Sequence, residues 1–538
     1  MKIMETIQYL VKIKNIFQNR KVFETFLLHI YIIFGKTVYM EIFKTQLKKM
    51  FLYEEPKNSY DFSLTKEPIL LNEDSISNAK QNISNELTTN LEYIKVKYNL
   101  LINSDIIIRE FLLNAKGKKY KACLIFIDGM VDAEIINNFV LKPLMLNNSV
   151  NTHIPLITKN KIHVKKIRKF NLENYIYNSL LTQNSVKKFS VISELIPRIN
   201  TGECALLVDT LDVGFSLDVK GYQSRNISTP QNETVVRGSQ EAFVEKIRTN
   251  TSMLRRLINN ENLVIENGTA GKISKTQIAI CYMKNIANLS LISEVKYRIN
   301  NIDVDSIISS GQLEQLIQDN SLSLFPQIVA TERPDKAANN LLEGRVIVIV
   351  NGSPYALIMP AVLIDFLASP EDINLKFQYS NLLKFIRILG FIITLFLPGF
   401  YIAITTYHTE LIPTELLFTI AASRNTVPFP IIFEIFLMEL SFELIREAGL
   451  RVPTPIGPTI GIVGALILGE AAVSANLVSP ILIIIVAITA ISSFSIPDFS
   501  LGFTLRVLRF IYVILGFMAG FLGIAARSFL RASDGFAL

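Results

Sequence analysis

Between Ile388 and Thr409 the sequence carries no charged residue, and no other feature restricts the possible folds as strongly. An uncharged run of this length forms an α-helix that spans the roughly 30 Å hydrocarbon core of a membrane. Three more apolar blocks follow, over residues 456–473, 481–496 and 510–526. We therefore predict an all-α polytopic membrane domain over residues 384–538, with four spans and a candidate fifth over Ile431–Ala448.

The candidate fifth span, Ile431–Ala448, differs from the others because it carries acids. Gly449 suits the C-terminal end of this helix. Glu439, Glu443 and Glu447 recur every fourth residue, so they share one helix face. Carboxylates are costly in lipid, so this face meets protein, headgroups or water. Two interpretations stay open: the three acids line a cation-attracting pore, or they hold an interfacial helix in place through ion pairs.

A stripe of small residues follows the acidic helix. It consists of Gly457, Gly461, Ala465 and Gly469. Small residues let two helix backbones approach closely in a membrane, where lipid supplies no hydrophobic drive between helices. The stripe therefore predicts a helix-packing face, and Gly516 and Gly520 form a second pair of this kind.

Residues 412–430, before the acidic helix, are predicted to form a loop or a re-entrant segment.

The charges are unevenly distributed along the chain. The residues from Lys384 on contain as many acids as bases, so the net charge of +7 arises in residues 1–383. Lys384 and Arg387 directly precede the first span, and no signal-peptide pattern opens the sequence. Basic residues next to a span favour the cytoplasmic side, so we expect the large N-terminal part to be cytoplasmic.

The N-terminal part is predicted to contain an extension and a globular head. Residues 1–90 have the composition of a basic extension and a polar linker, whose apolar-rich helices either lie on the membrane surface or pack on the next domain. Strand-like and helical patterns then alternate, which predicts an α/β or α+β head with subdomains over residues 91–195 and 196–383. Asn351-Gly352 between two apolar runs predicts a β-hairpin with a type I′ turn.

The sequence does not support the hypothesis that the protein is an enzyme. It contains no HExxH, GxSxG, GxxxxGKS or CxxC motif. Its three cysteines, Cys123, Cys204 and Cys281, are widely separated, which argues against a disulfide framework or a zinc site. We therefore predict a protein that is not an enzyme and that uses no cofactor and no metal.

Several long motifs resemble the A subunits of GerA-type spore germination receptors, over roughly residues 90–526. In the head they are SDIIIREF at 104–111, IDGMVDAEIINNFVLKPLM at 127–145, RGSQEAFVEKIRTNTSMLRRLI at 237–258 and ERPDKAANNLLEGRVIVIVNGSP at 332–354. In the membrane part they are IPTELLFTIAASRNTVPFP at 412–430 and the segment 438–480, which contains the stripe of small residues.

The resemblance implies a function as well as a fold. It implies a cytoplasmic head of two subdomains followed by a membrane domain, resident in the inner membrane of the dormant spore. The partners that it implies are a transporter-like B subunit, a C-subunit lipoprotein, membrane lipids and further copies of the chain, with no nucleic acid. It further implies that the complex senses a nutrient and triggers ion release.

Three classes of function are open to a chain with these features. The first is a germinant-receptor subunit that forms or gates an ion pathway, and the alternative is a non-conducting scaffold that couples a nutrient-binding partner to downstream germination proteins. A secondary transporter ranks last, because transporters usually contain internal repeats and the sequence holds no second copy of the acidic helix with its stripe.

Overall fold

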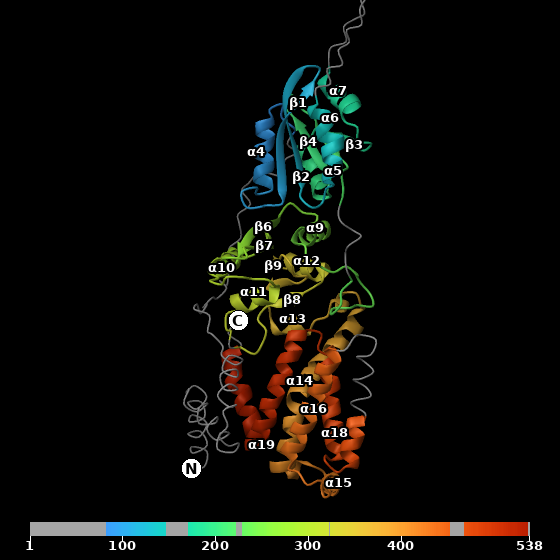
Figure 1. Cartoon of the computed structure of the whole chain (residues 1–538), viewed down its shortest axis with the longest axis vertical. Helices are drawn as coiled ribbons and strands as arrows, with labels where there is room; N and C mark the ends of the chain where they lie inside the picture. The colour runs from blue at the N-terminus through green and yellow to red at the C-terminus, as the bar shows by residue number, and fades with distance from the viewer. Residues whose placement is uncertain (1–81, 147–170, 222–228, 322, 452–466, 536–538) are drawn as a thin grey trace, which may run out of the picture. The chain divides into compact units, whose positions relative to one another are not determined.

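The computed structural model describes residues 82–146, 171–221, 229–321, 323–451 and 467–535. The chain divides into two compact units, residues 1–58 and 59–538, and every described residue belongs to the second. Two sheets with their helices form the N-terminal part of this unit, which we call the head (Figure 1). Long helices form the C-terminal part, which we call the helical region.

The first sheet of the head is antiparallel, with strand order β1-β2-β4-β5-β3. Its strands are β1 (Ile106–Ala115), β2 (Lys118–Ile127), β3 (Val186–Phe189), β4 (Cys204–Val208) and β5 (Gly214–Leu217). Lys116 and Gly117 join β1 to β2, and both have positive φ, as a tight hairpin turn requires.

Helices cover both faces of this sheet, because successive side chains of a strand point to opposite faces. The helices are α4 (Leu87–Lys97), α5 (Ala133–Ile135) with a π-helical stretch (Ile136–Leu141) and α6 (Lys142–Met145), α7 (Leu172–Tyr175) with a π-helical stretch (Ile176–Leu180), and α8 (Leu195–Asn200). In β2, Cys123 and Ile125 pack with α4 and α8, whereas Ala122 and Leu124 pack with the other helices.

The second sheet is also antiparallel, with strand order β6-β7-β9-β10-β8. Its strands are β6 (Leu263–Ala270), β7 (Thr276–Met283), β8 (Val329–Thr331), β9 (Val346–Val350) and β10 (Ala356–Met359). One face packs on α9 (Ile247–Leu257) and α12 (Pro334–Leu342), and the other packs on α10 (Leu289–Asn300) and α11 (Ser310–Ile317).

The predicted hairpin is confirmed, since β9 and β10 pair with each other directly. The turn differs from the predicted one, because residues 351–355 form a longer loop in which Gly352 alone has positive φ. The predicted fold class is confirmed as well: two sheets with helices precede an all-helical region. Every strand pair in the described residues is antiparallel, so the head is α+β rather than α/β.

The division between the sheets lies later than the predicted boundary between residues 91–195 and 196–383. Strands β4 and β5 pair with β2 and β3, so the first sheet continues to Leu217. The second sheet begins at Leu263. Local patterns could not place this boundary, because only non-local pairing assigns a strand to its sheet.

A buried joint connects the two sheets. Asn103 and Ser104 hydrogen-bond the backbone of Ile265 in β6, with Ser104 N donating to Ile265 O at 2.9 Å. Beside them, Arg255 of α9 makes a two-pronged ion pair with Asp105, with N···O distances of 2.7 and 2.8 Å. Both charged residues are buried, so this ion pair is a fixed link between the subdomains.

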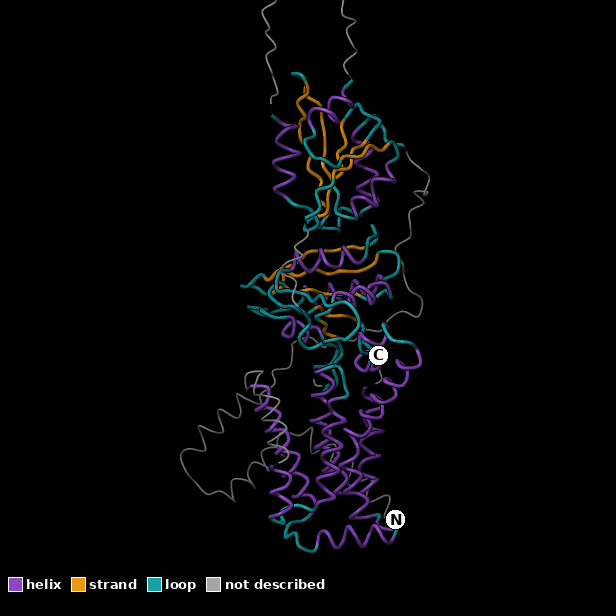
Figure 2. Tube along the Cα trace, turned by 90° about the vertical axis from the view of Figure 1, so that its right-hand side faces the viewer, coloured by secondary structure: helices purple, strands orange, loops and turns teal. Residues whose placement is uncertain are grey.

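The helical region begins with α13 (Leu363–Leu367) and a short turn, Pro370–Ile373. The long helices are α14 (Phe377–Tyr407), α15 (Thr414–Arg424), α16 (Ile431–Arg451), α18 (Pro480–Phe494) and α19 (Phe499–Gly535). Figure 2 shows that the strands are confined to the head and that the long helices of this region lie beside one another.

Two described helices are long and apolar enough to cross a membrane, Phe377–Tyr407 and Phe499–Ala525. Pro480–Phe494 is a shorter apolar helix. The predicted spans over 388–409, 481–496 and 510–526 coincide largely with α14, α18 and α19, whereas most of 456–473 lies outside the described residues. The number of spans therefore stays a prediction.

Helices α14 and α19 touch backbone to backbone where Gly399 crosses Gly516. A Cβ atom added at Gly516 would lie 2.6 Å from the Gly399 carbonyl oxygen. A Cβ added at Gly399 would lie 2.8 Å from the Tyr512 carbonyl oxygen. Only a residue without a side chain fits either position, so Gly516 serves the packing role that its spacing predicted.

We expect Gly516→Val to lower the stability of the helical region by about 1–3 kcal/mol, because a side chain there meets rigid backbone rather than a movable side chain. Gly502→Val is the matched control: it places the same residue in α19, where an added Cβ has nothing within 4 Å. Thermal unfolding of the purified chain in detergent measures both. Equal losses in the two variants would show that helix propensity, not the crossing, causes the effect.

Helix α19 is broken at Ala519 and Gly520, whose backbone angles are not helical. At the break, nearby backbone carbonyls lose the N–H donors that a regular helix would supply. Tyr407 at the end of α14 supplies a hydrogen-bond donor in their place. Its hydroxyl donates to the Phe517 oxygen at 2.7 Å. The end of α14 therefore holds the break of α19 in place.

Candidate functional site

The acidic face predicted for α16 meets basic side chains of α19. Arg509 Nη2 lies 2.7 Å from Glu439 Oε2 and 3.1 Å from Glu443 Oε1. Arg506 Nη1 lies 3.1 Å from Glu443 Oε2. Glu439 and Glu443 are one turn apart on α16, and Arg506 and Arg509 are three residues apart on α19, so two complementary stripes face each other.

A third arginine, Arg446 of α16, completes what we call the charge cluster: Glu439, Glu443, Arg446, Arg506 and Arg509. Arg446 Nη1 lies 3.8 Å from Glu443 Oε1, and Nη2 donates to Ser493 Oγ of α18 at 2.7 Å. Its guanidinium also lies 4.4 Å from the Phe494 ring centroid. With two acids and three bases, the cluster carries a formal excess of one positive charge.

The charge cluster is unusual because two of its charged side chains are almost completely buried. The side chains of Arg509 and Glu439 are 2% and 1% exposed. Removing two charges from water is costly, and the pair repays that cost only when its geometry is good. Charged groups inside membrane helices face the interior of the bundle or a watery cavity, and they commonly mark a functional site.

The three predicted acids differ in their surroundings. Glu439 is enclosed, Glu443 is 25% exposed and Glu447 is exposed. Glu434, in the first turn of α16, is fully buried, accepts a hydrogen bond from Ser479 N at 3.1 Å and lies 3.5 Å from Arg424 Nε. The acids therefore do not form one uniform open stripe on a single chain.

The predicted packing stripe falls largely outside the described residues. Gly457, Gly461 and Ala465 belong to the segment that the structure does not describe. Gly469 is buried, and a Cβ added there would lie 3.9 Å from Ile483 of α18, an ordinary contact. The packing role of the stripe stays a prediction.

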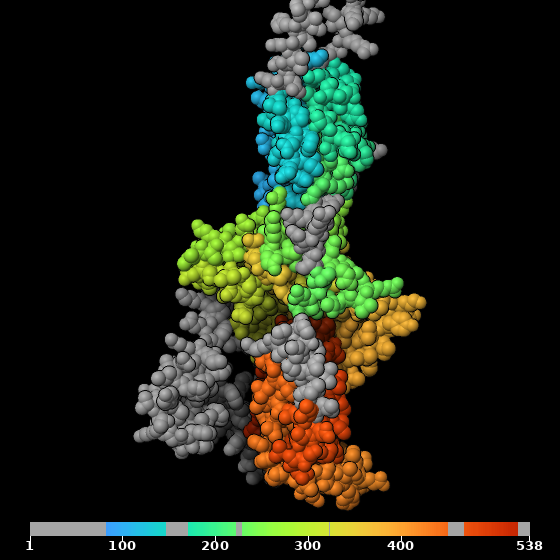
Figure 3. Space-filling model, turned by 45° about the vertical axis from the view of Figure 1, so that its right-hand side comes forward, coloured from blue at the N-terminus to red at the C-terminus, as the bar shows by residue number. Residues whose placement is uncertain are grey.

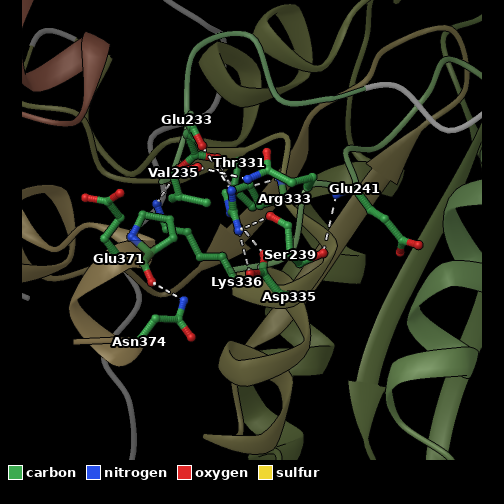
Figure 4. A network of polar contacts seen from close by, with 12 residues as sticks. Glu233, Val235, Ser239, Glu241, Thr331, Arg333, Asp335, Lys336, Glu371 and Asn374 are labelled. Atoms are coloured by element: carbon green, nitrogen blue, oxygen red, sulfur yellow. Dashed lines mark hydrogen bonds and ion pairs between the residues drawn. The ribbon is translucent and has the colours of Figure 1, made fainter. Parts of the chain in front are cut away.

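A second polar network lies in the head, where a segment without regular structure wraps the start of α12 (Figure 4). We call residues 229–241 the strap. Arg333 is fully buried and donates to the carbonyl oxygens of Glu233 at 3.1 Å and Ser239 at 2.9 Å. Lys336 Nζ binds Glu233 Oε1 at 2.8 Å. Two cations at the start of α12, one of them in the residue that precedes the helix, thus fix the strap.

The strap also reaches the turn that precedes α14. Val236 N donates to Glu371 Oε1 at 2.6 Å. The neighbouring Asp372 accepts from Arg387 of α14 at 2.6 Å. The strap and the first candidate span therefore both bind this turn through adjacent acids, Glu371 and Asp372.

Glu314 of α11 lies close to Asp498, the residue before α19. Burial, together with the negative charge of Asp498, raises the pKa of Glu314 to about 7. A glutamate in an unfolded chain titrates near 4.5, so between about pH 4.5 and 7 the folded chain holds a proton that the unfolded chain has lost. This contribution to stability is full below pH 4.5 and is lost as the pH rises through about 7.

We expect Glu314→Gln to remove this pH dependence. The stability of the variant should equal that of the original chain near pH 4.5 and exceed it at pH 8 by on the order of 1 kcal/mol. The reason is that glutamine places no negative charge beside Asp498. Thermal unfolding across this pH range measures the effect. Glu343→Gln, at a side chain that is 63% exposed, is the control. A pH profile that Glu314→Gln leaves unchanged would contradict the assignment.

No pattern in the sequence assigned Arg506, Arg509 or Arg333 to these two networks. Arg506 and Arg509 offered a signal, since they are a basic pair three residues apart beside the apolar block 510–526. Arg333 and Lys336 lie in the motif ERPDK, yet nothing in its spacing pointed to a strap about 100 residues earlier.

Comparisons with known proteins extend over both parts of the chain. A family model described as "Bacillus/Clostridium GerA spore germination protein" matches residues 92–532. Spore germination protein KA of Bacillus subtilis (strain 168) is 39% identical over 423 residues, which are 78% of this chain and 74% of that protein. Spore germination protein A1 of the same organism is 42% identical over 344 residues, 64% of this chain and 71% of that protein.

The chain is also similar to a solved structure. That structure is the crystal structure of the N-terminal domain of the A subunit of the Bacillus megaterium spore germinant receptor GerK3. The match has 30% sequence identity and a TM-score of 0.38, and covers 53% of this chain and 98% of that domain.

Proposed function

We propose that this chain, which belongs to the GerA family of spore germination proteins, is the A subunit of a nutrient germinant receptor. We further propose that copies of it assemble to form or gate an ion pathway. It resides in the spore inner membrane with its head in the cytoplasm, beside a transporter-like B subunit and a C-subunit lipoprotein. Several of the similar proteins are spore germination proteins, which supports a role as a receptor subunit.

The observation that carries the proposal is the charge cluster between α16 and α19. Arg509 anchors α16 through Glu439, so the rotation of α16 about its own axis is fixed. Glu443 and Glu447 follow on the same face and are progressively more exposed. In a symmetric assembly each of these acids repeats around the axis, and a ring of carboxylates favours cations over anions. The anchored helix α16 thus lines the pathway.

The test is the ion selectivity of the purified receptor complex in liposomes. Glu447→Gln and Glu443→Gln each remove one ring of charge, and we expect both to lower the permeability ratio of cations to anions while the complex stays assembled. Glu415→Gln is the control, because Glu415 is an exposed acid of α15 outside the cluster. An unchanged ratio in abundant, assembled complexes would remove α16 from the pathway.

The second candidate is the non-conducting scaffold, and one observation favours it. Glu439 and Glu443 are paired with arginines of their own chain, so their charges need no passing ion. A scaffold shows no conductance in liposomes but still co-purifies with its partner subunits. The same reconstitution therefore separates the two candidates.

A further inference from the structure

The segment between α14 and α16 exposes large apolar side chains that the proposed ion pathway does not use. Helix α15 packs on α18, and Arg424 at its end pairs with Glu434 of α16. Within α15 the one buried residue is Ile420. Three large apolar side chains of the segment are well exposed: Leu411 (66%), Leu416 (49%) and Phe418 (71%). Figure 3 shows this segment as the orange surface at the lower end of the helical region.

The exposed surface of α15 includes an apolar strip. Phe418, Ala421 and Ala422 are spaced three and four residues apart, so they share one face, and all three are exposed. Glu415 and Thr419 form a narrow polar stripe beside this face. Water is a poor environment for such a surface, because large apolar side chains gain free energy when they leave it.

The position of α15 in the chain decides what covers this surface. Helix α14 is a candidate span. Arg387 ties it to the turn Pro370–Ile373, which the strap of the head contacts, and its 31 residues extend about 46 Å. Residues 408–413 then connect it to α15 and reach at most about 20 Å. Helix α15 therefore starts within reach of the membrane face opposite the head.

We infer that α15 lies in the lipid interface on the side opposite the head, with Phe418 inserted at the boundary between headgroups and acyl chains. Exposed apolar side chains in the first half of α14, among them Phe385, Ile388 and Ile392, are available to the same lipid bilayer. The inference rests on the proposed function, because it requires α14 to span the membrane.

The chain contains no tryptophan, so a single introduced tryptophan is a clean reporter. Three full-length variants are reconstituted into phosphatidylcholine vesicles with brominated acyl chains, which quench tryptophan on contact. Phe418→Trp reports on α15, Ile392→Trp reports on the span, and Leu101→Trp reports on a fully exposed position of the head. We expect loss of fluorescence in the first two and none in the third.

The depth of the bromine atoms sharpens the test. Phe418→Trp should be quenched more strongly by shallow than by deep bromines, and Ile392→Trp should show the reverse order. Quenching of Ile392→Trp without quenching of Phe418→Trp would overturn the inference and leave the span intact. In that outcome a blue-shifted emission would mean that protein covers α15, and a red-shifted emission that water does. Quenching of neither variant would contradict the membrane location itself.

Discussion

Arg509→Met lowers the free energy of unfolding of the helical region by about 3–5 kcal/mol, because it leaves Glu439 as an unpaired charge in the interior. Among the described residues, Arg509 is the one cation within 4 Å of Glu439, at 2.7 Å. Methionine keeps much of the arginine volume, so the loss reports on charge rather than on a cavity. Thermal unfolding in detergent and the amount of folded protein recovered from membranes both measure it.

Two further variants test the cause of this loss. Arg509→Met combined with Glu439→Gln removes both charges, and we expect it to regain most of the lost stability. Arg506→Met is the matched control in the same helix. It should cost much less, because its partner Glu443 keeps Arg509 at 3.1 Å. If Arg506→Met and Arg509→Met were equally destabilising, the special role of the buried pair would be wrong.

Arg255→Met has an effect of similar size in the head, about 3–5 kcal/mol, because it strands the buried carboxylate of Asp105. It also removes the Arg255 Nη2 hydrogen bond to Asn103 Oδ1, at 3.1 Å. The joint between the two sheets should open first. Hydrogen exchange of the amides at residues 98–105 and in β6 should therefore accelerate more than exchange in β9, and thermal unfolding gives the total loss.

The adjacent residue provides the control for this prediction. Arg256 pairs with Glu241 at the surface, where both side chains are about one-third exposed. Exposed pairs contribute about 0–1 kcal/mol, so Arg256→Met should change stability by no more than that. An Arg255→Met chain that unfolds like the Arg256→Met chain would show that the joint does not depend on the ion pair.

The sequence predicted those features that depend on residues near one another in the chain. The uncharged run before Thr409 identified α14, and the spacing of Glu439 and Glu443 placed both acids on one face. Their partners on α19 lie more than 60 residues away, so no local pattern joined them. The same limit explains the misplaced subdomain boundary, since β4 belongs to its sheet through pairing with β2.

The strap was the hardest feature to predict. Residues 229–241 have no periodic pattern, because they form neither helix nor strand. Their positions are set by hydrogen bonds between backbone groups and the side chains of Arg333, Glu332 and Glu371. Backbone groups are present at every residue, so a sequence carries no mark of which of them are used.

The crossing of Gly399 and Gly516 gives α14 the geometry of an unequal lever. Backbone contact fixes the helix most tightly at this crossing, because a Cβ added at Gly390 would lie farther, 3.2 Å, from the Ser492 backbone oxygen of α18. Phe377 lies about 33 Å from this fulcrum and Tyr407 about 12 Å on the other side, at 1.5 Å per residue. A tilt imposed at the head end therefore moves the far end in the opposite direction and by roughly a third as much.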